Sequence, residues 1–170
     1  MKATLWKLLG MAVIFGLATP EVYADDWVVS FGYSVIPDET INGQRYRTSG
    51  NVNLWFGAPE AINYRQGFYI NAALPEEVWN SGNGRESSSY TLVNAGFTFI
   101  PSDAFILYAG PGLSYQRVNP RAPLETFHRY RLNANLGAII KIGSFGINLS
   151  YDTAPKAVAV GVLLRSSAFQ

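Results

Sequence analysis

The 170-residue sequence contains no cysteine and a single histidine. The absence of cysteine excludes disulfide crosslinks, thiol nucleophiles and thiolate metal sites. Charged residues make up only 15% of the chain, and the 13 basic residues nearly cancel the 12 acidic ones. Because a phosphate-binding surface needs an excess of basic residues, this balance argues against a nucleic acid partner.

Long hydrophobic runs are also lacking, apart from one near the start of the chain. Lys2 and Lys7 accompany the apolar segment LLGMAVIFGLA, and Val22 and Ala24 occupy positions suited to a signal peptidase. This order predicts a cleaved secretory signal peptide over residues 1–24. The apolar run is shorter than the ~20 residues that a membrane-spanning helix needs.

The remaining chain, residues 25–170, is expected to form one domain and is dominated by alternating residues. In the stretch FILYAGPGLSYQ, every second residue from Phe105 onward is apolar, and the residues between are mostly small or polar. This period of two predicts a strand, because successive side chains leave opposite faces of the pleat. Eight segments show the pattern: 27–35, 46–56, 62–74, 89–99, 105–116, 130–140, 145–152 and 158–165.

The connections and the aromatic residues indicate what the apolar faces contact. Long connections alternate with short ones, except at the short last hairpin, as is typical of outer-membrane barrels. Outward aromatic residues gather near both ends of the segments, as expected for rings at two membrane interfaces. These predicted interface aromatics are Trp27, Tyr33, Tyr46, Phe56, Tyr64, Phe99, Phe105, Tyr115, Tyr130, Phe145 and Tyr151.

The predicted fold is therefore all-β, an eight-stranded antiparallel up-and-down transmembrane β-barrel. A barrel of eight strands is just wide enough for side chains to fill its interior. The inward polar residues expected to fill it are Arg47, Asn51, Asn53, Arg65, Asn71, Arg131, Asn133, Asp152 and Arg165. Buried charges need partners, so Asp152 is expected to pair with a neighbouring arginine. Pro111, which lacks a backbone donor, is expected to force a bulge.

With its signal and the segments LYAGPGLSYQ, RLNANLGAIIKIG, FGINLSYD and AVAVGVLLR, the chain resembles the small outer-membrane β-barrels. This group includes the OmpA-type transmembrane domain and the opacity-like proteins. The resemblance implies a Gram-negative outer membrane, with long loops extracellular and termini periplasmic. It implies lipid, lipopolysaccharide and the barrel-assembly machinery as partners. Two features depart from the pattern: the tail SSAFQ follows the last strand, and Gln66 falls among the lipid-facing residues.

A non-catalytic role, structural or through loop-mediated binding, fits these residues best, with a polar plugged lumen. One alternative is a small anion-preferring pore, because four of the expected interior residues are arginines. A second is a lipid-modifying enzyme that uses His128, although no serine adjoins that histidine as a catalytic triad would require. A soluble lipocalin-like barrel would need an apolar lumen. No cofactor or metal is expected, and the loop acids Asp38 and Glu39 are expected to be solvated.

Overall fold

The computed structural model describes residues 27–76, 86–120, 124–143 and 145–165, with only the backbone of Arg165. The predicted signal peptide and the SSAFQ tail lie outside these residues. Eight strands form the barrel: β1 (Val28–Val35), β4 (Asn51–Asn63), β5 (Gln66–Pro75), β6 (Ser87–Ser102), β7 (Phe105–Asn119), β8 (Phe127–Ile142), β9 (Phe145–Asp152) and β10 (Ala157–Arg165). Two more strands, β2 (Glu39–Ile41) and β3 (Gln44–Thr48), form a hairpin in the first long connection. Within the described ranges, no helix is long and apolar enough to cross a membrane.

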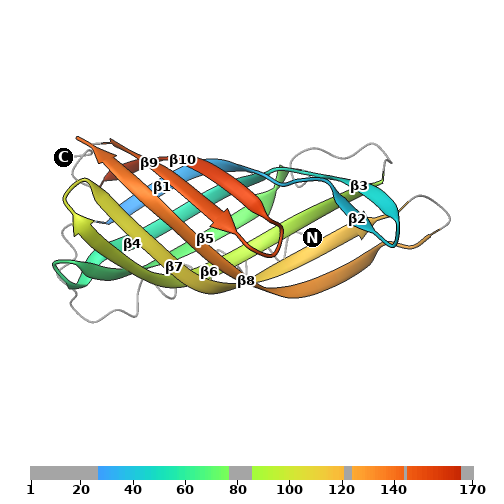
Figure 1. The fold of residues 1–170 in the computed structure, drawn as a ribbon, viewed down its shortest axis with the longest axis horizontal. Helices are drawn as coiled ribbons and strands as arrows, with labels where there is room; N and C mark the ends of the chain where they lie inside the picture. The colour runs from blue at the N-terminus through green and yellow to red at the C-terminus, as the bar shows by residue number, and fades with distance from the viewer. Residues whose placement is uncertain (1–26, 77–85, 121–123, 144, 166–170) are drawn as a thin grey trace.

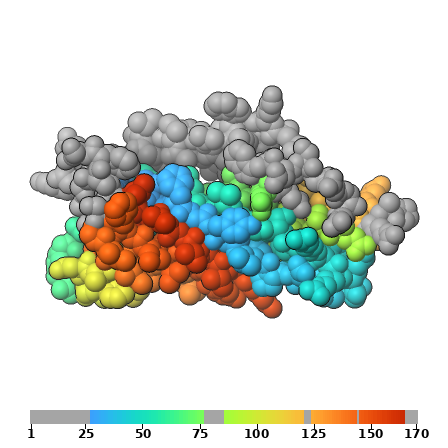
Figure 2. Space-filling view, turned by 90° about the horizontal axis from the view of Figure 1, so that it is seen from above, coloured from blue at the N-terminus to red at the C-terminus, as the bar shows by residue number. Residues whose placement is uncertain are grey.

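The eight strands close into one antiparallel barrel, which confirms the predicted fold. Their order is β6-β5-β4-β1-β10-β9-β8-β7, and pairing of β6 with β7 completes the ring. The strands run diagonally around the barrel (Figure 1), and the space-filling view shows β10 in red beside β1 in blue (Figure 2). Closure leaves no sheet edge along the paired part of the wall.

The two ends of the barrel differ. Tight turns connect β4 with β5, β6 with β7 and β8 with β9 at one end, which we call the turn end. At the other, the loop end, β6, β7 and β8 continue well past the β9–β10 hairpin (Figure 1). The β2–β3 hairpin joins this extension, because β3 pairs in parallel with β6. Ile41 and Tyr46 of the hairpin pack on Val118 of β7, with Phe127 beside them.

The prediction of one strand over residues 46–56 is wrong at its start. The structure has two strands there, β3 and β4, separated by Ser49 and Gly50. The alternation changes phase across this break. Tyr46, expected at the membrane interface, is therefore 3% exposed, and Arg47, expected in the lumen, is exposed. A Cβ at Gly50 would meet the ring of Tyr33, which would have to move.

The turn expected over residues 57–61 lies instead at Tyr64 and Arg65. Gly57 and Pro59 stay within β4, and the β4–β5 register shifts between Ala58 and Asn63. A bulge tolerates glycine and proline in a strand. Arg65, expected in the lumen, is consequently exposed in the turn.

The expected bulge at Pro111 is also wrong. Pairing of β6 with β7 is interrupted opposite Pro111 but resumes in the same register, Asn94 with Gly112 and Phe97 with Ala109. Pairing with β8 continues through Pro111 without a shift. Gly96 and Gly110 lie so close together beside this gap that a Cβ on either would collide with the other strand. The backbone N–H that Pro111 lacks therefore costs hydrogen bonds, but β7 keeps its register with both neighbouring strands.

Candidate functional site: the barrel interior and the loop-end rim

Toward the turn end, the interior is filled by aromatic and aliphatic side chains. Trp55, Tyr69 and Tyr108 come from three strands and meet with ring centroids 4.8 to 5.7 Å apart. Each of the three is at most 4% exposed. We call this set, with the surrounding residues Val28, Ile100, Ile106, Ile139 and Leu163, the aromatic layer. The phenol groups of both tyrosines bond to asparagines, Asn135 and Asn148, so the layer joins a polar one.

The middle of the interior holds a carboxylate surrounded by amides, which we call the amide layer. Asp152 is 2% exposed. Its Oδ1 accepts hydrogen bonds from the side-chain amides of Asn94 at 3.0 Å, Asn133 at 2.6 Å and Asn135 at 3.2 Å. The Asn94 amide also donates to Asn71 Oδ1 at 3.2 Å, which extends the network across to β5.

The prediction that Asp152 pairs with an arginine is wrong for the described side chains. Side-chain amides bond to the carboxylate instead, and the arginines expected in the lumen lie at other places. Arg131 sits at the loop end, 3.4 Å from Glu39, and is partly exposed. Arg47 and Arg65 are outside the lumen, and the side chain of Arg165 lies outside the described part of the structure. Three polar donors on one oxygen can replace a cation as the source of compensation for a buried charge.

At the loop end, Glu39 from the β2 strand turns into the barrel mouth. Its Oε2 accepts hydrogen bonds from Tyr90 Oη at 2.7 Å and Gln116 Nε2 at 2.6 Å, and its Oε1 lies 3.4 Å from Arg131. We call these four residues the mouth network. The sequence expectation that Asp38 and Glu39 are merely solvated is wrong, because Asp38 also pairs with Arg45 at 3.0 Å.

Eight of the nine interior residues predicted from sequence fall into three groups, and the side chain of the ninth, Arg165, lies outside the described part of the structure. Five are buried in the lumen: Asn51, Asn53, Asn71, Asn133 and Asp152. Arg131 lies at the mouth, and Arg47 and Arg65 are on the outside. The predicted set omits Glu39, Asn94, Asn135 and Gln116; all but Glu39 occupy inward positions of regular strands, where the alternation places them.

The outer wall carries the apolar residues. Eight of the predicted interface aromatics are exposed: Tyr33, Phe56, Tyr64, Phe99, Phe105, Tyr130, Phe145 and Tyr151. Trp27 and Tyr115 are half-buried by ring stacking, Trp27 on Phe56 at 4.6 Å and Tyr115 on His128 at 5.4 Å. His128 Nδ1 also shares a 2.7 Å hydrogen bond with the Tyr115 hydroxyl. The partner seen for this histidine is thus a phenol on the outer wall.

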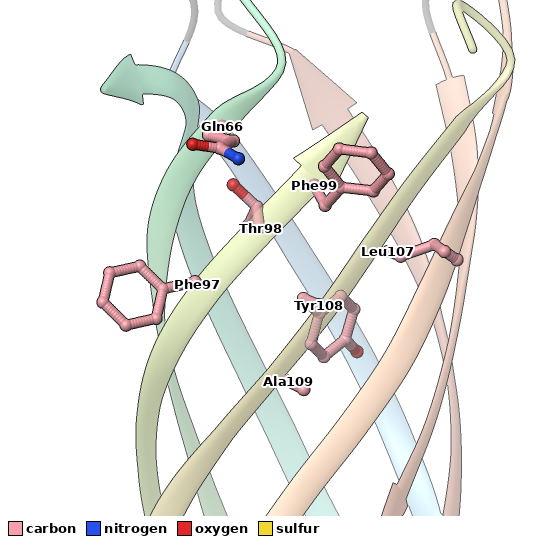
Figure 3. A pocket seen from close by; sticks show the side chains of 7 residues that line it. All are labelled: Gln66, Phe97, Thr98, Phe99, Leu107, Tyr108 and Ala109. Atoms are coloured by element: carbon pink, nitrogen blue, oxygen red, sulfur yellow. The ribbon is translucent and has the colours of Figure 1, made fainter. Parts of the chain in front are cut away.

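A groove of about 440 Å³ indents the wall between β6 and β7 toward the turn end. It is lined by Gln66, Phe97, Thr98, Phe99, Leu107, Tyr108 and Ala109, and the ring of Phe97 projects away from the strands (Figure 3). None of these seven side chains carries a charge. The groove therefore offers an apolar contact surface and no acid–base pair.

No protein-family model and no curated protein matches this chain. Solved structures do. The crystal structure of Ail, the attachment invasion locus protein of Yersinia pestis, matches with a TM-score of 0.56 and 16% identity over 82% of this chain and 95% of Ail. Ail in complex with the heparin analogue sucrose octasulfate gives a TM-score of 0.56 at 17% identity, over the same shares of both chains. The backbone structure of Ail in a phospholipid bilayer nanodisc gives 0.51 at 18% identity, over 82% of this chain and 98% of Ail. At this identity the likeness establishes the fold, a closed eight-stranded antiparallel β-barrel.

Proposed function

We propose that this chain is an integral outer-membrane barrel of a Gram-negative bacterium, with a plugged lumen and a non-catalytic role in binding at the cell surface. The observation that carries the proposal is the reversed polarity of the barrel. The middle of its interior and its mouth are built on amides and carboxylates, beside the aromatic layer at the turn end, while large apolar residues such as Phe31, Phe97 and Val162 are 57 to 70% exposed on the outside. An apolar surface of this extent on an isolated chain is typical of a membrane contact.

The interior supports a closed lumen. The aromatic layer, the amide layer and the mouth network each bring together side chains from three or more strands. Two of the arginines on which an anion-selective pore would depend, Arg47 and Arg65, lie outside the barrel. The pore is therefore the weaker proposal.

A binding role fits the shape of the loop end. The extension of β6, β7 and β8 with the β2–β3 hairpin carries its own small core and projects beyond the barrel wall formed by β9 and β10. Ail, the attachment invasion locus protein, shares the fold, which supports placing the present chain among barrels that act by surface contact. The pairing of His128 with Tyr115, rather than with a serine, supports a non-catalytic role.

The test combines cell fractionation with one substitution. In a Gram-negative host, the chain should be recovered in the washed outer-membrane fraction and should migrate faster on a detergent gel when unboiled. Val162→Arg places a charge on the apolar wall and should remove most of the folded band, because a cation at mid-membrane costs about 2–4 kcal/mol. Val162→Leu is the matched control and should assemble normally. Soluble periplasmic recovery, with Val162→Arg fully tolerated, would contradict the proposal.

A further inference from the structure

The groove between β6 and β7 interrupts an otherwise bulky outer wall. The outward residues beside Ala109 on β7 are larger, with Leu107 on one side and Pro111 on the other. On β6, Phe97 stands opposite Ala109, and Phe99 stands opposite Leu107. One small outward residue among larger ones therefore leaves a hollow of about 440 Å³. This volume is within the range of small-molecule sites, about 300–1,000 Å³.

The side chains beneath the groove belong to the interior. Thr98 and Tyr108 line it but are only 2% and 4% exposed. Thr98 Oγ1 donates to the carbonyl of Pro59 at 3.2 Å, and Tyr108 Oη donates to Asn148 Oδ1 at 2.6 Å. A ligand in the groove thus lies on the outer wall, over the strands, and leaves the interior bonds in place.

The groove has a polar end. Gln66 lies at one end and Ala109 at the other (Figure 3). Gln66 is exposed and pairs with Phe99 on a wall that is otherwise apolar. Its Oε1 accepts a hydrogen bond from Asn63 Nδ2 at 3.0 Å, and within the described ranges its Nε2 donates to no other residue. The sequence departure at Gln66 therefore supplies one uncharged donor at the end of an apolar groove.

A cation stands next to this donor. Arg65 directly precedes Gln66, and its carbonyl accepts a hydrogen bond from Ile100 N–H at 2.8 Å, which holds the turn beside β6. The Arg65 guanidinium lies 5.3 Å from the ring centre of Tyr64, which is 76% exposed. Among the described residues Arg65 has no ion pair. A guanidinium presents paired N–H groups that match the oxygens of a phosphate.

We propose that this groove is a binding site for one phospholipid molecule. An acyl chain lies over Ala109, between the side chains of Phe97 and Leu107. The ester carbonyl accepts a hydrogen bond from Gln66 Nε2, and the phosphate pairs with Arg65.

The order of these groups along the wall carries the assignment. An apolar groove, an uncharged donor and a cation follow one another as acyl chain, ester and phosphate do in a phospholipid. A peptide segment fits less well, because its backbone groups would lack partners against apolar side chains in lipid. The inference rests on the proposed function, since it requires the outer wall to lie in a membrane.

The test uses the mature barrel folded in maltoside detergent, which carries no phosphate, after the gel shift has shown that the barrel is folded. The probe is phosphatidylglycerol with a photoreactive diazirine in one acyl chain, added in equal amount to the protein. After illumination, mass spectrometry locates the labelled residues. Labelling at Phe97 and Leu107 should exceed labelling at Phe31 and Val162, which are also exposed on the wall, by about tenfold.

Matched substitutions separate the site from general contact with lipid. Ala109→Leu fills the groove and should reduce labelling there to the level of the remaining wall, whereas Ala72→Leu, on the outer face of β5, should change nothing. Arg65→Gln should lower labelling of the groove by about tenfold, because it removes the charge-assisted contact. Arg47→Gln removes an exposed arginine of β3 instead and is the control.

A second probe isolates the phosphate. Diacylglycerol with the same photoreactive chain should label the groove about tenfold less than phosphatidylglycerol, and Arg65→Gln should not affect it. Equal labelling by the two probes would overturn the proposal, because the phosphate would then not be recognised.

Other results would also overturn it. These are uniform labelling of the wall in a folded barrel, or labelling of the groove that survives Ala109→Leu. Stronger displacement of the probe by lipid A than by unlabelled phosphatidylglycerol would assign the groove to lipid A. Loss of labelling when the barrel is concentrated at a constant ratio of lipid to protein would assign it to a second copy of the chain. Failure of the proposed function is a separate result, recovery of the chain in the soluble periplasm.

Discussion

At the scale of single residues, Asp152 is the acceptor on which the amide layer depends. Removing its carboxylate leaves the amides of Asn94, Asn133 and Asn135 buried without that acceptor. An unsatisfied buried donor costs roughly 1–3 kcal/mol. We expect Asp152→Ala to lower the free energy of unfolding by about 2–5 kcal/mol, measured by urea titration in lipid vesicles. Asp152→Asn should cost less, because its side-chain oxygen can still accept.

A second buried position supplies the matched control for this prediction. Asn51 is 0% exposed, and neither Oδ1 nor Nδ2 has a hydrogen-bond partner among the residues that the structure describes. Asn51→Ala removes a buried amide of the same kind without breaking a bond. Its cost should stay within about 1 kcal/mol, because loss of the unpaired amide offsets lost contacts. Equal costs at Asp152 and Asn51 would show that the convergent hydrogen bonds do not stabilise the barrel.

At the scale of elements, Glu39 adds a polar attachment of the β2–β3 hairpin to the barrel, beside the β3–β6 pairing and the packing of Ile41 and Tyr46 on Val118. Glu39 bonds to Tyr90 and Gln116 and lies near Arg131. Charge-assisted hydrogen bonds contribute about 1.5–3 kcal/mol each when partly buried. Glu39→Ala should therefore speed amide exchange in residues 40–45 by about tenfold or more, while the exchange of β9 and β10 stays unchanged.

Asp38→Ala is the control within the same hairpin. It removes the Asp38–Arg45 pair, in which the arginine side chain is 78% exposed, and an exposed 3.3 Å hydrogen bond from Thr48 N–H to Asp38 Oδ1. Such a pair contributes about 0–1 kcal/mol, so exchange in the hairpin should change by only a few fold. If Asp38→Ala loosens the hairpin as much as Glu39→Ala does, the mouth network is not its anchor.

The same hairpin marks the limit of prediction from sequence. Within regular strands a period of two is enough to assign faces, which is why Asn71, Asn133 and Asp152 were placed inside from alternation alone. Alternation does not show where a strand is interrupted, and the two faces exchange their residues across such an interruption. The strand is interrupted at Ser49 and Gly50, and across this interruption Tyr46 is buried and Arg47 exposed.

Long-range contacts set the remaining differences between the expected and the observed site. Glu39 lies 77 positions from Gln116, and no local pattern connects a loop acid to a glutamine of a distant strand. The partner of Asp152 was predicted from the general need of a buried charge for compensation, and three amides take the place expected for an arginine.

At the scale of the whole molecule, the proposed plug would block the lumen in series. The aromatic layer, the amide layer and the mouth network each join side chains from three or more strands across the interior. For an ion to pass, all three would have to open, so removing one should not create a pore. We expect no current steps in planar bilayers from the original chain, from Glu39→Ala or from Trp55→Ala.

A triple variant truncates one side chain in each layer: Glu39→Ala, Asp152→Ala and Trp55→Ala. It should conduct ions, provided that the unboiled protein still migrates faster on a gel, as a folded barrel does. Trp55→Ala alone loses about 3–5 kcal/mol, so the gel shift must be checked for every variant before current is recorded. Current steps from Glu39→Ala alone would mean that water already reaches through the two lower layers. The mouth network would then be a gate and not one of three barriers, and a small pore would replace the plugged barrel as the better proposal.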